Sequence, residues 1–187
     1  MTRKEQKEER RQQILLTALE LFVKRGYHDT KITDIAEAVP MSTGLMFHYF
    51  GSKEDLLTEL VKMGMRGPGS VEGKVGVSPD VYLLSFLKQM FSFAKDQPWV
   101  FNMFVLMGQV RRPGMPEEAR KLASSVNALA PTVSLIKKGQ KEGLFHKGDP
   151  DTMARCFWAS VQGIMEEMAV DPEMKYPDPE WIVAILK

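Results

Sequence analysis

The sequence lacks the features that would tie it to a membrane or to an oxidising compartment. Cys156 is the only cysteine in 187 residues, so no intramolecular disulfide can form, which fits a reducing compartment. No apolar run approaches the ~20 residues that cross a bilayer. The N-terminal segment MTRKEQKEERRQQ is charged and has no apolar signal-peptide core. We therefore expect a cytoplasmic protein with no membrane partner.

Charge and chemistry-bearing clusters are also sparse. The formal net charge is only +1, so any contact with nucleic acid must come from a local patch. His28, His48 and His146 lie far apart in the sequence without cysteine or carboxylate at ligand spacing, so we expect no metal and no cofactor. Cys156 sits in an apolar pattern and is interpreted as a buried small hydrophobe.

Catalytic motifs are missing as well. No acid/base pair or nucleophile constellation stands out. The glycine-rich segment 64–76 lacks the strand–loop–helix setting and the Lys-Ser/Thr ending of a phosphate-binding loop. A small all-α enzyme is therefore the weaker alternative, and a helical adaptor protein is another.

The sequence does contain a long series of amphipathic helical patterns. Leu15, Ala18, Leu19 and Phe22 repeat at helical spacing, and no convincing strand pattern occurs. We predict an all-α fold of about nine helices. One expected helix covers 117–142, with Pro131 as a kink or interruption. The predicted domains are 1–52, a connecting helix and glycine-rich linker over 53–79, and a helical domain over 80–187.

The segment from Thr33 to Leu57 predicts two short helices around a tight turn. Thr33 is the expected N-cap of the first helix, and Pro40 ends it. Ser42 is the expected cap of the second helix, over 43–49. Such a pair places its second helix across a surface, where it can enter a DNA major groove.

The residue types of the second helix suit that role. Ser42, Thr43 and Gly44 are small, so the backbone can approach a phosphate or a base edge. His48 and Tyr49 offer a donor or a ring. Lys53, which opens the following helix, carries an ammonium that can pair with a phosphate. The alternative interpretation of His48 is an exposed or helix-packing histidine, and we favour contact with DNA.

Over about 60 residues the N-terminal part resembles the DNA-binding domain of TetR-family transcriptional regulators. The resemblance rests on Phe22, Gly26-Tyr27, Thr33, Ile35-Ala36, Ala38, Ser42, Gly44, the run Phe47-His48-Tyr49-Phe50, Ser52-Lys53-Glu54 and Leu56. It implies that Thr33, Thr43, His48, Tyr49 and Lys53 lie near DNA. The family usually has tyrosine at the position of Phe47, often bonded to a phosphate. We interpret Phe47 as a packing or sugar contact.

The rest of the chain resembles the family only in its helical layout, which implies a domain that senses a ligand. Its aromatic and methionine residues are read either as ordinary core or as the lining of an apolar pocket, since methionine packs adaptably. The predicted ligand-binding residues are Phe86, Met90, Trp99, Asn102, Met103, Phe104, Met107, Phe157, Gln162 and Met165. Asn102 and Gln162 would supply polar contacts.

Small residues at 159 and 163 permit close approach of another helix. Together with the last helix they resemble the family's dimer interface, although packing within one chain is the alternative. The predicted interface residues are Ala159, Gly163, Trp181, Ile182 and Ile185. The resemblance thus implies a homodimeric repressor that binds a near-palindromic double-stranded DNA operator and is released by a small apolar effector.

Overall fold

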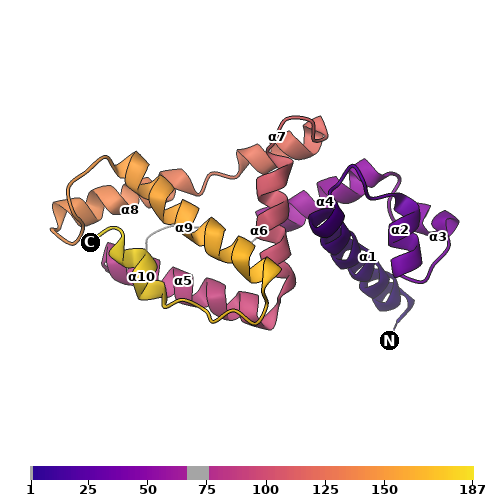
Figure 1. The fold of residues 1–187 in the computed structure, drawn as a ribbon, viewed down its shortest axis with the longest axis horizontal. Coiled ribbons are helices and arrows are strands. Elements are labelled where there is room, and N and C mark those ends of the chain that lie inside the picture. The colour runs from indigo at the N-terminus through magenta and orange to yellow at the C-terminus, as the bar shows by residue number, and fades with distance from the viewer. Residues whose placement is uncertain (1, 67–75) are drawn as a thin grey trace. The chain divides into compact units, whose positions relative to one another are not determined.

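The structure is a computed structural model that describes residues 2–66 and 76–187, and every regular element in these ranges is an α-helix (Figure 1). The predicted all-α class is therefore confirmed. The helices are α1 (Arg3–Arg25), α2 (Ile32–Ala38), α3 (Thr43–Phe47), α4 (Lys53–Met65), α5 (Pro79–Asp96), α6 (Trp99–Val110), α7 (Glu117–Ser125), α8 (Leu129–Lys141), α9 (Pro150–Val170) and α10 (Pro179–Ala184).

The chain forms two compact units. One combines the residues up to 66 with 102–125, and the other combines the described residues of 76–101 with 126–187. The division passes through α6, whereas the predicted domains place all of 80–187 together. These compact units are defined by packing, whereas the predicted domains are defined by function. The predicted domains therefore stay a prediction. The central part of the expected linker, residues 67–75, lies outside the described residues.

The first unit is built on the apolar stripe of α1. Leu15, Ala18, Leu19 and Phe22 are buried as their spacing predicts, and α1 packs against α2 and α4. The helix ends at Gly26, whose φ of 89° lies in a region that side chains rarely adopt. Helix α2 also packs on α3, and α4 packs on α7. This arrangement fixes α2 and α3 on the scaffold of α1 and α4 (Figure 1).

The second unit packs α9 against α8 and α10, and α5 against α8 and α10. Its interior is apolar and includes Leu83, Leu87, Ile136, Phe157 and Val161, all fully buried. Such burial of large side chains is the main stabilising term of a helical unit.

The expected long helix over 117–142 is two helices, α7 and α8, separated by residues 126–128. The side chain of Asn127 accepts a hydrogen bond from the backbone N–H of Ala130 at 3.1 Å, which supports a new helix start. Pro131 then falls in the first turn of α8, where its missing N–H costs no helical hydrogen bond. The proline therefore marks a beginning rather than a kink.

The described residues contain neither a membrane-spanning helix nor a cluster of metal-ligating side chains. No helix among them is both long and apolar enough to cross a membrane. The same part of the chain contains no group of three or more His, Cys, Asp or Glu side chains that could hold a metal ion.

Candidate nucleic-acid interface

Helix α2 begins earlier than the sequence predicts. Its N-cap is Lys31, and Thr33 is an exposed residue inside the first turn, so the prediction of Thr33 as the cap is wrong. The carboxylate of Asp34 accepts a hydrogen bond from the backbone N–H of Lys31 at 2.8 Å. An acidic side chain in the first turn thus serves the free N–H group, and no cap hydroxyl is needed.

The turn between α2 and α3 is closed by backbone hydrogen bonds. The N–H of Met41 donates to the carbonyl of Ala36 at 3.0 Å. Ser42 then caps α3, because its hydroxyl accepts a hydrogen bond from the N–H of Leu45 at 3.1 Å. The predicted cap is confirmed. The two short helices and their tight turn therefore have the helix-turn-helix form that the sequence predicts.

Helix α3 is anchored by one side and leaves the other open. Met46 is fully buried, and Thr43 and Tyr49 are half-buried. Gly44 and His48 are exposed. Of the predicted contact residues, Ser42, Gly44 and His48 are thus accessible, and Thr43 and Tyr49 are partly so.

Two large apolar side chains of this helix are also exposed, and the sequence analysis did not single out Leu45 and gave Phe47 only as a packing or sugar contact. Leu45 is 45% exposed and Phe47 is 51% exposed. Phe47 is not a core residue, because the chain covers only about half of its surface. Its contact with a sugar stays a prediction. The signal that could have found both residues is that Met46 alone supplies the inward apolar position of this short helix.

Lys53 has a different environment from the one expected. Its ammonium donates hydrogen bonds to the carbonyls of Tyr27 at 2.8 Å, Thr30 at 2.9 Å and His28 at 3.4 Å. It also lies 4.3 Å from the centre of the Tyr27 ring. These contacts tie the start of α4 to the connector after α1. Burial, followed by the charge of Glu54, raises the pKa of Tyr27 to about 12.

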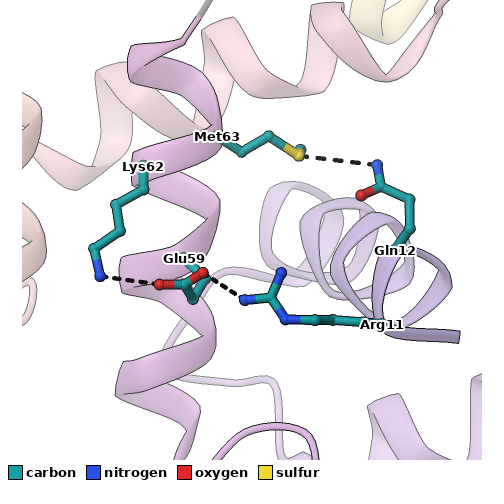
Figure 2. Close-up of polar contacts among 5 residues, drawn as sticks. All are labelled: Arg11, Gln12, Glu59, Lys62 and Met63. Carbon is teal, nitrogen blue, oxygen red and sulfur yellow. Dashed lines mark hydrogen bonds and ion pairs between the residues drawn. The ribbon is translucent and has the colours of Figure 1, made fainter. Parts of the chain in front are cut away.

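An ion pair joins α1 to α4 further along (Figure 2). The guanidinium of Arg11 donates to the carboxylate of Glu59, which also accepts from Lys62 at 2.9 Å. The hydrogen bond from Lys62, supported by Arg11, holds the pKa of Glu59 below its usual value. Arg11 also lies 5.1 Å from the ring centre of Phe50, just beyond α3. The same side chain therefore contacts α4 and the segment that follows α3.

The predicted ligand-binding residues belong to both units. Asn102, Met103, Phe104 and Met107 lie in the first, and Phe86, Met90, Trp99, Phe157, Gln162 and Met165 lie in the second. A side chain at Gly64 of α4 would meet the sulfur of Met103 at 2.8 Å and that of Met107 at 3.0 Å. These two methionines thus pack closely on α4. In the second unit, Phe86 lies 6.1 Å from Trp158, ring centre to ring centre.

Four of the five predicted interface residues are exposed. Ala159 and Gly163 are accessible on α9, and Trp181 and Ile185 are 71% and 38% exposed. Ile182 differs, because it is 3% exposed and packs in the core of its own chain. The alternative of packing within one chain thus describes Ile182, whereas the other four residues are accessible on α9 and α10.

Cys156 lies on the exposed side of α9, so its prediction as a buried residue is wrong. The neighbouring Phe157 is fully buried and occupies the inward position at that turn. One helical step of about 100° therefore carries Cys156 out of the core. Ala159, three residues later, is exposed on the same side.

Residues 14–60, from within α1 to within α4, match the model of the bacterial regulatory proteins of the tetR family. Over 50 residues the chain is 50% identical to the HTH-type transcriptional regulator HbdR of Aromatoleum sp. (strain CIB), a match that covers 27% of this chain and 22% of that protein. Over 179 residues it is 23% identical to the HTH-type transcriptional repressor Rv1474c of Mycobacterium tuberculosis (strain ATCC 25618 / H37Rv), covering 95% of this chain and 89% of that one.

The fold matches that of AibR, solved in complex with isovaleryl coenzyme A and operator DNA. The TM-score is 0.73 at 20% identity, over 95% of this chain and 97% of that chain. Residues 14–60 match the DNA-binding part of the tetR family of bacterial regulatory proteins. This match to the tetR-family model supports DNA binding by the helix-turn-helix. The matched relatives are named as transcriptional regulators and repressors.

Proposed function

We propose that this chain is a cytoplasmic transcriptional repressor that binds a near-palindromic operator as a homodimer and is released by a small apolar effector. The observation that carries the proposal is the open outer side of α3, which packs on α2 inside the segment that matches the family model. The proposed DNA contacts come from Thr33, Ser42, Thr43, Gly44, His48 and Tyr49. Lys53 would act by positioning α4.

A second copy of the chain would cover the exposed residues of α9 and α10. Trp181 and Ile185 are large apolar side chains left in solvent, and such side chains are favourable to bury in an interface. Ala159 and Gly163 would let a partner helix approach closely. Two α3 helices held roughly 34–36 Å apart would then enter successive major grooves of the operator.

The effector is proposed to bind among the aromatic and methionine side chains of the helices after residue 80. AibR was solved with isovaleryl coenzyme A as well as operator DNA, so a protein of this fold accommodates an acyl compound. Only one separation of the two DNA-binding units fits the duplex. An effector that stabilises a different separation would therefore lower the affinity for DNA.

The test of DNA binding is fluorescence anisotropy with the duplex upstream of the chain's own gene and with a random duplex of equal length. We expect specific binding to the first, with an affinity that falls steeply as salt rises, because phosphate contacts release counterions. Thr43→Ala should weaken it. Ser134→Ala, an exposed serine on α8, is the control. Equal affinity for both duplexes and no effect of Thr43→Ala would refute the proposal.

The test of the dimer is sedimentation of the free chain. Trp181→Arg should shift it toward monomer and weaken binding to the operator. Met65→Arg, which changes an apolar residue that is 40% exposed at the end of α4, is the matched control and should leave the dimer intact. A wild-type chain that sediments as a monomer at all concentrations would exclude this mode of assembly.

A further inference from the structure

The segment around α3 has an unusual composition for an element that reads DNA. From Ala38 to Ser52 it contains no Asp, Glu, Lys, Arg, Asn or Gln. Arginine and lysine recognise guanine, asparagine and glutamine recognise adenine, and acidic side chains recognise cytosine in the major groove. None of these pairings is available from this segment. Of the standard base contacts, it retains hydroxyl groups and apolar contact with the C5-methyl group of thymine.

The outer side of α3 presents a suitable apolar group. Residues three or four apart share a face of a helix, so Phe47 lies beside Thr43 and Gly44. Phe47 is 51% exposed. A Cβ atom added at Gly44 would meet nothing within 4 Å, so this face is open and its backbone is unshielded. Leu45 lies two positions from Phe47, about 200° around the helix, and so on the opposite flank.

We propose that Phe47 recognises a thymine of each operator half-site by packing its ring on the C5-methyl group, with the methyl group of Thr43 beside it. The proposal rests on the proposed function, in which α3 enters the major groove. Phe47 carries no hydroxyl, so it offers a phosphate no hydrogen bond, whereas burial of its exposed ring against a methyl group is favourable. The absent side chain at Gly44 lets the helix come close enough for this contact.

The experiment compares thymine with deoxyuridine, which lacks only the methyl group. A tight-binding duplex is first selected from a random library with the full-length wild-type chain. Each thymine is then replaced singly by deoxyuridine, and Kd is measured by anisotropy for the wild type, Phe47→Ala and Leu45→Ala. Leu45→Ala is the matched control, because it removes an equally exposed apolar side chain from the other flank of the same helix.

We expect one position in each half-site where deoxyuridine weakens wild-type binding about fourfold, the effect of one buried methyl group. Phe47→Ala should bind more weakly overall and show no further loss at that position. Leu45→Ala should keep the fourfold loss.

Two results would overturn the inference. One is deoxyuridine without effect at every position in the wild type, a measurement that depends on no variant. The other is the same loss at each position in the wild type and in Phe47→Ala. A library that yields no duplex bound better than random DNA would instead refute the proposed function, together with this contact.

Discussion

Replacement of Lys53 distinguishes two roles of this residue, a contact with a DNA phosphate and a structural link between α4 and the connector after α1. The sequence predicts a phosphate partner, and the structure gives its ammonium the carbonyls of Tyr27, His28 and Thr30. In Lys53→Met the aliphatic part of the side chain is kept and the charge is removed. These carbonyls then lose their common donor, and the start of α4 is no longer joined to the connector after α1.

The size of the effect follows from these contacts. A hydrogen bond to a charged group contributes about 1.5–3 kcal/mol, and a partly solvated cation over an aromatic ring adds about 0.5–1 kcal/mol. Because Lys53 is only half-buried, water replaces part of the lost bonding. We expect the free energy of unfolding to fall by about 2 kcal/mol, which lowers Tm by about 4–8 °C for a chain of this size.

The assay is thermal and urea denaturation of the chain without DNA, with Lys62→Met as the control. Lys62 is also a lysine of α4, but its partner is the partly exposed Glu59, so its loss should cost under about 1 kcal/mol. A melting temperature of Lys53→Met equal to that of the wild type would refute the structural role. If the salt dependence of DNA binding then fell by about one unit of slope, Lys53 would be a phosphate contact instead.

Three further substitutions test other parts of the structure. Gly44→Ala should raise Tm, since alanine favours a helix by about 1 kcal/mol, yet weaken operator binding in anisotropy; unchanged affinity would place this face outside the groove. Gly139→Ala would put a Cβ 2.2 Å from the ring of Phe145, so we expect a loss of about 1–3 kcal/mol in urea melts, and wild-type stability would contradict the packing. Glu59→Gln removes a carboxylate whose pKa is lowered first by its hydrogen bond from Lys62. Its stabilising effect should be present at neutral pH and disappear as the pH falls through that lowered pKa, so a stability difference unchanged in acid would rule out the ion pair.

The helices of the first unit could be predicted because their periodicity and their burial agree. The stripe of Leu15, Ala18, Leu19 and Phe22 is long enough to define one buried face, and all four side chains are buried. The cap at Ser42 was also predictable, since a serine before a short apolar run favours a helix start. Both inferences use only interactions within a few residues of each other.

Helix boundaries failed where a side chain offered an alternative hydrogen bond. Asp34 binds the N–H of Lys31 and moves the start of α2 ahead of Thr33. Asn127 binds the N–H of Ala130 and begins α8 after a break. For α2 both Lys31 and Thr33 fit the start of the helix, and for α8 the helical pattern runs through Asn127 without a break. Propensity ranks such residues too closely to decide between them.

The outer side of α3 could not be predicted for a different reason. Met46 and Phe47 are adjacent large apolar residues, and burial of either one satisfies the pattern of so short a helix. The structure buries Met46 completely and leaves Phe47 51% exposed, a choice made by how α3 docks on α2. A helix of five residues needs only one inward anchor. The second apolar residue therefore contributes little to the fold, and a partner outside the chain gives its exposed ring a physical reason to be there.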